Sequence, residues 1–187
     1  MTAGRLILVV GRSGAGKDSI LNGARKALAD DPDVVFSRRV ITRPADPTVE
    51  DHDTLSVERF WEARQAGDFA LFWSAHDLHY AIPISIENDL AAGKIVVANT
   101  SRTIIAEARS RYPNTQVILV TAAPETLAAR LAARGREDAK GVEKRLARSV
   151  DTPSDAEGTW IVENDGHLAD ALDRFVGLLQ GAKPSHA

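Results

Sequence analysis

Residues 6–17 read LILVVGRSGAGK, and most of the fold prediction follows from this stretch. It starts with five consecutive aliphatic residues, the pattern of a β-strand that is buried on both faces. The next seven residues, GRSGAGK, fit the pattern G-x-x-x-x-G-K and lead into a helical pattern over residues 17–29. Between a strand and a helix, such glycines let successive backbone N–H groups point at a phosphate, while the lysine reaches the β- and γ-phosphates. The stretch therefore predicts a phosphate-binding loop, and the alternative is an ordinary glycine-rich turn.

The residue after this lysine departs from the usual motif, which continues with Ser or Thr. Asp18 follows Lys17, and Ser19 comes one position later. A carboxylate is a hard oxygen ligand for Mg²⁺, so we expect ATP bound together with Mg²⁺ and Asp18 as the metal ligand. The residues that the motif assigns to ATP are Gly11, Arg12, Ser13, Gly14, Ala15, Gly16, Lys17, Asp18 and Ser19.

Strand and helix patterns alternate along the rest of the chain. Further strands are predicted over residues 34–41, 69–73, 95–98, 116–121 and 160–162. Helices are predicted from the N-cap Ser56 to Gly67, from Pro124 to Gly135, and over residues 85–92, 101–111, 142–150 and 168–179. Residues 44–55 are rich in Pro and Asp and are predicted as a loop. The alternation predicts an α/β fold with a mostly parallel central sheet that is covered by helices on both faces.

Composition narrows the class of protein. The chain has 187 residues, which suits one domain, and it has no cysteine, which excludes disulfides and cysteine-based metal sites. Its 23 basic and 26 acidic residues give a net charge of −3, so a nucleic-acid partner is not expected. It has no apolar run of the roughly 20 residues that span a bilayer, and we expect no membrane partner. Without a recognisable secretion signal, we expect a cytoplasmic protein. The oligomeric state stays open, with a homodimer as one option.

Several separated segments resemble the guanylate kinase-like branch of the P-loop kinases, over nearly the whole chain. SRRVITR at residues 37–43 is similar to the acceptor-phosphate segment of that branch, residues 69–80 to its acceptor strand and loop, and WIVENDG at residues 160–166 to its last strand. Arg130, Arg134, Gly135 and Arg145 are similar to its lid. The resemblance implies one kinase domain. Its core would be residues 1–36, 94–130 and 155–182, with an acceptor-binding region over about 37–93 and a lid over about 131–150.

Two departures from guanylate kinases concern the acceptor. Leu71 stands where those enzymes have the glutamate that reads guanine, and the aspartate expected after residues 95–98 is missing from VANTS at residues 97–101. A leucine cannot accept hydrogen bonds from guanine N1 and N2, and a site built on polar pairing discriminates strongly.

These changes resemble the ribose 1,5-bisphosphate phosphokinase family of phosphonate catabolism. The segments that carry this resemblance are GKDS at 16–19, EDH at 50–52, FALFWSAH at 69–76 and YAIP at 80–83, although a glycine would be expected in place of Ala81. The resemblance implies synthesis of 5-phosphoribosyl 1-diphosphate (PRPP) from ATP and ribose 1,5-bisphosphate. The acceptor phosphate has a second pKa of about 6, so it is already an anion and needs no general base.

The resemblance also implies roles for individual residues. Lys17, Arg134 and Arg145 would act on the transferring phosphoryl group, and Arg130 would bind ATP. Arg39, Arg43 and Tyr80 would bind the acceptor, and Asn164 would lie near adenine. For the arginines the alternative is a solvated surface. The histidines His52 and His76 are interpreted as loop residues, and Phe69, Phe72 and Trp73 as core.

Two other functions compete with this one. The chain could be a nucleoside monophosphate kinase with a different choice of base, or an inactive guanylate kinase-like module that binds proteins. The module is disfavoured because Lys17 and the glycine spacing are intact, and protein binding does not need them.

Overall fold

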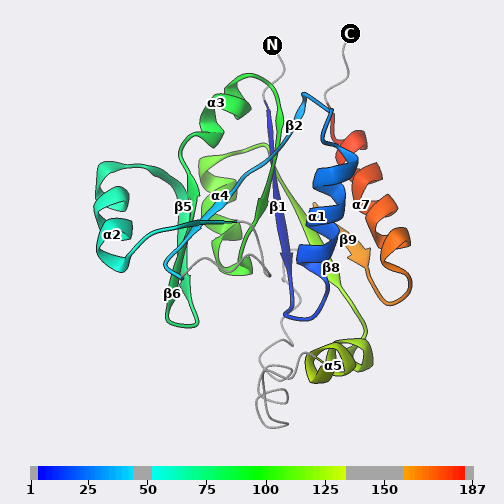
Figure 1. The fold of residues 1–187 in the computed structure, drawn as a ribbon. Coiled ribbons are helices and arrows are strands. Elements are labelled where there is room, and N and C mark those ends of the chain that lie inside the picture. Colours follow the sequence, from blue (N-terminus) through cyan, green and yellow to red (C-terminus); the bar gives the residue numbers. More distant parts are fainter. Residues whose placement is uncertain (1–3, 44–51, 134–157, 184–187) are drawn as a thin grey trace.

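Strand β1 (Arg5–Gly11) lies in the middle of a five-stranded sheet of order β2-β7-β1-β8-β9 (Figure 1). The computed structural model describes residues 4–43, 52–133 and 158–183. The other strands of this sheet are β2 (Val34–Phe36), β7 (Ile95–Asn99), β8 (Thr115–Thr121) and β9 (Thr159–Glu163). All neighbouring strands pair in parallel, so their carboxyl ends meet at one edge, where the loop after β1 begins. The predicted parallel α/β sheet is confirmed.

The apolar run in β1 supplies both faces of this sheet. Ile7 and Val9 belong to the core under α1 (Lys17–Ala27) and α7 (Leu168–Gly181), which pack side by side (Figure 1). Leu6, Leu8 and Val10 point to the opposite face, which is covered by α3 (Ile86–Ala91), the short 3₁₀ helix η1 (Arg102–Ile104) and α4 (Ile105–Arg111). Each fully buried aliphatic side chain contributes about 1.5–3 kcal/mol, so this strand anchors both halves of the core.

A second sheet of order β4-β3-β6-β5 lies beside the first one. It contains β3 (Arg39–Ile41), β4 (His52–Thr54), β5 (Phe69–Ala75) and β6 (Leu78–Pro83). β5 and β6 form a hairpin whose two turn residues, His76 and Asp77, both have left-handed φ angles of 53° and 60°, as a type I′ turn requires. Helix α2 (Val57–Ala66), capped by the side chain of Ser56, packs Phe60 against Val40 and Ala81 of this sheet.

The second sheet corrects two predictions and adds a strand that the sequence analysis missed. Residues 34–41 do not form one strand, because β2 pairs with β7 in the central sheet and β3 pairs with β6 in the second sheet. Residues 52–54 belong to a strand rather than to a loop, and residues 78–83 form a strand that was not predicted. The partner changes after Phe36, where the N–H of Ser37 makes the last hydrogen bond to β7, with the carbonyl of Val97. Hydropathy patterns show that a segment is extended but not which strand it pairs with.

The remaining described helix, α5 (Pro124–Ala133), follows β8 as predicted. Its predicted end at Gly135, the predicted helix over residues 142–150, and Arg134 and Arg145 all lie outside the described residues. Within the ranges given above, no helix combines the length and the apolar character that a membrane span requires.

Candidate active site

The loop after β1 has the shape of a phosphate cradle. Gly14 and Gly16 have left-handed φ angles of 88° and 82°, which residues with a Cβ rarely adopt. Gly16 is the N-cap of α1, and no side chain of the described residues makes a capping hydrogen bond to this helix. The first N–H groups of α1 are therefore available to an anion, and the helix dipole adds partial positive charge there.

Asn164, which follows β9, anchors this loop through its side chain. Its side chain is buried, and its Nδ2 donates a hydrogen bond to the carbonyl of Ala15 at 2.8 Å. The backbone N–H of Asn164 donates to the carbonyl of Thr121 at 2.9 Å, which ties the residue to the end of β8. Arg130 of α5 also approaches the loop, because its Nη1 would lie 3.8 Å from a Cβ placed on Gly16. The predicted contact of Asn164 with adenine stays a prediction.

The loop faces the second sheet across a cavity of about 300 Å³. Residues from both sides line it, namely Gly11, Arg12, Ser13, Gly14, Gly16, Lys17, Asp18, Arg39, Ile41, Arg43, Trp73, Ala75, His76, Tyr80, Thr100 and Ser101. The structure thus brings together the predicted ATP loop and all three predicted acceptor residues, Arg39, Arg43 and Tyr80. Ala15, Ser19 and Arg130 are not among the lining residues. The roles assigned to all these residues stay predictions.

The cavity carries an excess of positive charge. Arg12, Lys17, Arg39 and Arg43 line it together with one acidic residue, Asp18. Burial lowers the pKa of Lys17 to about 8, although Asp18 opposes this effect. Burial likewise lowers the pKa of Arg39 to about 10, again against Asp18. Among the described lining residues Asp18 is the only acidic one beside four cations, so anionic ligands would be attracted to this cavity.

Buried polar atoms of Arg43 and Thr100 in the cavity wall also lack hydrogen-bond partners among the described residues. Nε of Arg43 and Oγ1 of Thr100 make no hydrogen bond within the described part of the chain. Buried polar groups are nearly always paired, so such atoms at a cavity mark places where a ligand or water binds.

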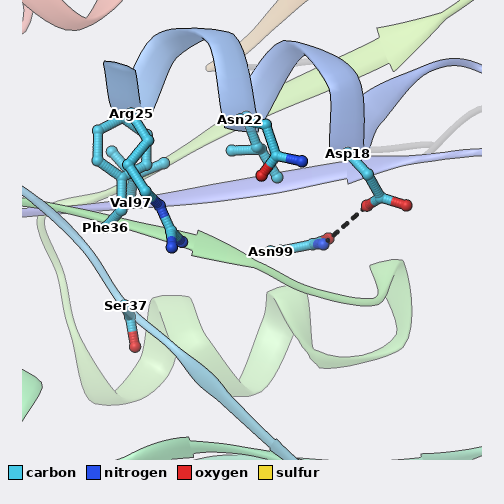
Figure 2. A pocket seen from close by; sticks show the side chains of 8 residues that line it. Asp18, Asn22, Arg25, Phe36, Ser37, Val97 and Asn99 are labelled. Carbon is cyan, nitrogen blue, oxygen red and sulfur yellow. Dashed lines mark hydrogen bonds between the residues drawn. The ribbon is translucent and has the colours of Figure 1, made fainter. Parts of the chain in front are cut away.

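Asn99 joins the two charged residues at the start of α1. Its Oδ1 accepts a hydrogen bond from Nζ of Lys17, and its Nδ2 donates to Oδ1 of Asp18 at 3.2 Å (Figure 2). Lys17 Nζ and Asp18 Oδ1 are 3.6 Å apart. In the sequence, the only feature that drew attention to Asn99 was the absence of the aspartate expected after residues 95–98. Its position at the end of the strand next to β1 is the signal that points to the site.

The wall on the acceptor side is aromatic. Trp73 and Tyr80 stack with ring centroids 5.4 Å apart and planes at 6°, and the guanidinium of Arg39 lies 5.5 Å from the Tyr80 ring centroid. The interpretation of Trp73 as core is right for its burial but incomplete, because the residue also lines the cavity. Leu71 is fully buried in the apolar core next to Trp73 and does not line the cavity.

The other residues singled out in the sequence differ in whether they line the cavity. His76 lines the cavity, whereas His52 is buried on β4 and does not. Arg38 is not among the residues that line the cavity, and it forms an ion pair with Asp53 at 3.2 Å. Neighbouring arginines therefore have different surroundings.

Replacing Gly16 by Ala is expected to raise the KM for ATP by about 10- to 100-fold. A Cβ at this position would overlap Nδ2 of Asn164 and would push the loop off its anchor. The left-handed φ adds about 1–2 kcal/mol of strain. Steady-state kinetics with varied ATP would measure the change.

Gly67→Ala is the matched control, because Gly67 has a φ of 83° and open space around its Cβ position. It carries the same backbone strain without the overlap, so we expect lower stability and an unchanged KM. Equal kinetic behaviour of the two variants would contradict the role given to the Asn164 anchor.

Curated proteins resemble the chain over most of its length. A protein of Acidiphilium cryptum named ribose 1,5-bisphosphate phosphokinase PhnN is 52% identical over 177 residues, which cover 95% of this chain and 93% of that protein. A protein of the same name from Rhodopseudomonas palustris is 46% identical and covers 91% of this chain and 87% of its own length. One from Bradyrhizobium diazoefficiens is 49% identical, with coverages of 81% and 76%. No family model matches the chain.

Solved structures share the fold at low sequence identity. A guanylate kinase from Anaplasma phagocytophilum has a TM-score of 0.74 at 14% identity, and the match covers 99% of this chain and 89% of that one. A sugar kinase from Janibacter has a TM-score of 0.54 at 17% identity, covering 97% and 99%. These likenesses show the fold, whereas the curated relatives carry the information on function.

Proposed function

The chain belongs to the ribose 1,5-bisphosphate phosphokinase family, and from this premise we propose that it transfers the γ-phosphoryl group of ATP to ribose 1,5-bisphosphate. The reaction joins a phosphoryl group to the 1-phosphate and so yields 5-phosphoribosyl 1-diphosphate and ADP. The observation that carries this proposal is the cavity itself. One phosphate cradle and a cluster of arginines face each other across a space of about 300 Å³.

For this reaction the protein must supply positive charge and must align the two phosphate groups. An oxygen of the acceptor phosphate attacks the γ-phosphorus, while the bond between that phosphorus and the bridging oxygen of ADP breaks. The attacking oxygen is already anionic, so no proton has to be removed. The barrier arises from bringing two anions together in line, and Lys17, Arg39 and Arg43 supply cations on both sides of the cavity. The loop N–H groups and Lys17 would hold the β- and γ-phosphates.

Asp18 fits a divalent cation at the donor side. Its side chain is 47% exposed, lines the cavity and stands beside Lys17. Within the described ranges, no group of three or more His, Cys, Asp or Glu gathers into a metal site. One carboxylate together with substrate phosphates is the ligand set that Mg²⁺ commonly uses. We propose that Asp18 holds Mg²⁺ with ATP, where the ion would neutralise charge on the phosphate oxygens.

Arg39, Arg43 and Tyr80 are proposed to bind the acceptor. Nε of Arg43 is buried and unpaired in the described chain, and it faces the same cavity as the loop. The wall formed by Trp73 and Tyr80 offers ring faces and one hydroxyl rather than a carboxylate. Such a wall gives no carboxylate to pair with the N1 and N2 donors of guanine, and it suits a sugar that carries its charge on two phosphates.

The proposed division of the chain follows from these roles. The core would be residues 1–36, 94–130 and 155–182, and the acceptor-binding region would be residues 37–93, which include all of the second sheet. The lid over residues 131–150 would bring Arg134 and Arg145 to the transferring phosphoryl group, while Arg130 at its base would bind ATP.

The test of this function is a comparison of acceptors. ADP release is followed in a coupled assay with ATP and Mg²⁺. We expect release with ribose 1,5-bisphosphate, and a rate at least about 100-fold lower with GMP, AMP or dTMP. Faster turnover with a nucleotide would assign the chain to nucleoside monophosphate kinases. Absence of turnover with all four acceptors, in protein that still folds, would favour the binding module.

A further inference from the structure

We propose that Asn99 is a positioning residue of the phosphate-binding loop. Its neutral amide holds the ammonium of Lys17 in place for ATP without adding a second carboxylate beside Asp18. This inference rests on the proposed function only as far as ATP binding, and it does not depend on the identity of the acceptor. By the resemblance described above, an aspartate is expected after residues 95–98, and this chain has Asn99 there at the end of β7.

The two ends of the Asn99 amide have opposite partners. The carbonyl oxygen accepts from the ammonium of Lys17, and the amide nitrogen donates to the carboxylate of Asp18 at 3.2 Å. Figure 2 shows the Asp18 and Asn99 side chains pointing toward one another from α1 and β7. The reversed amide would face a cation with N–H groups and an anion with an oxygen, so its two partners fix its orientation.

An aspartate at this position would change the charge balance. Residue 99 is only 4% exposed, and a carboxylate there would meet the Asp18 carboxylate at the distance where the amide now donates. Two carboxylates beside Lys17 would outweigh the charge of its ammonium, close to the place where a triphosphate must bind. The amide keeps the count at one carboxylate and one lysine.

The amide also makes it easier for Lys17 to move to the nucleotide. When Lys17 turns toward the phosphates, Asn99 loses one hydrogen bond from a cation to its neutral amide and keeps its bond to Asp18. A buried aspartate in the same place would lose its counter-ion, which costs far more than one hydrogen bond. Asn99 therefore positions Lys17 without competing with ATP for it.

The test is ATP binding by calorimetry, with and without Mg²⁺ and with no acceptor present. We expect Asn99→Asp to weaken binding of metal-free ATP by about tenfold or more, and excess Mg²⁺ to reduce this loss. The double variant Asp18→Asn/Asn99→Asp again has one carboxylate and one amide. It is expected to recover at least half of the loss on a logarithmic scale.

Asn22→Asp is the matched control, because Asn22 is exposed one turn further along α1 and lines the small pocket beside Asp18 (Figure 2). It adds the same charge without touching Lys17, and we expect metal-free ATP binding within about twofold of the parent protein. The inference is overturned if Asn99→Asp binds metal-free ATP like the parent, if the double variant is no better than Asn99→Asp, or if Asn22→Asp loses as much affinity.

The outcome separates this inference from the proposed function. Parent protein that binds ATP and shows the Asn99 effect, but does not phosphorylate ribose 1,5-bisphosphate, would remove the acceptor assignment and leave the role of Asn99 intact. Normal turnover of the sugar bisphosphate with an unaffected Asn99→Asp variant would do the opposite. Unfolding midpoints from circular dichroism identify a variant that has merely lost its fold.

Discussion

The variant Lys17→Met is expected to lower kcat/KM for ATP by at least about 10³-fold while the protein stays folded. Lys17 is the cation of the loop motif, its side chain is only 16% exposed, and it faces the cavity shared by donor and acceptor. Methionine keeps the aliphatic length but removes the ammonium that would bind the β- and γ-phosphates. Coupled measurement of ADP release with ribose 1,5-bisphosphate gives the rate.

Lys26→Met provides the comparison on the same helix. Lys26 lies in the last turn of α1, is exposed and stands far from the loop. The same charge is lost there, so kcat/KM is expected to stay within about twofold of the parent value. Parent-like turnover by Lys17→Met, or an equal loss in both variants, would remove the donor-site assignment.

Arg39→Met is expected to raise the KM for ribose 1,5-bisphosphate by about 10²- to 10³-fold, with a much smaller effect on the KM for ATP. The guanidinium stands over the Tyr80 ring in the cavity wall, where burial lowers the Arg39 pKa to about 10. In such surroundings a phosphate contact is poorly screened and its loss is large. Initial rates with each substrate varied in turn separate the two KM values.

The neighbouring residue gives a stringent control for this prediction. Arg38 is half-exposed, forms an ion pair with Asp53, and is not among the residues that line the cavity. Exposed pairs contribute little, so Arg38→Met is expected to change either KM by less than about threefold. A larger effect of Arg38→Met than of Arg39→Met would place the acceptor phosphates on the other side of the strand.

Prediction from sequence succeeded where the signal was local. The run LILVV at residues 6–10 predicted a strand buried on both faces, and its odd and even residues indeed belong to the two separate cores. The glycines and Lys17 predicted the cradle at the start of α1, because the left-handed angles at Gly14 and Gly16 are a requirement on single residues.

Prediction was incomplete where strands change partners. Residues 34–41 carry one extended pattern but belong to two sheets, and the strand over residues 78–83 depends on a turn in which His76 and Asp77 take left-handed angles. Neither residue is a glycine, so the sequence lacks the Asn-Gly or Asp-Gly pair that usually predicts such a turn.

By itself, the sequence determined the class of fold, the position of the phosphate loop and the family, because these depend on residue types at short spacings. Only the tertiary structure decided that Asn99 bridges Lys17 and Asp18, that Asn164 anchors the loop, and that Arg38 pairs with Asp53. Lys17 and Asn99 are 82 residues apart in the chain, and Ala15 and Asn164 are 149 apart. Contacts over such separations are set by how strands pair and how sheets pack, and hydropathy patterns contain no information on these choices.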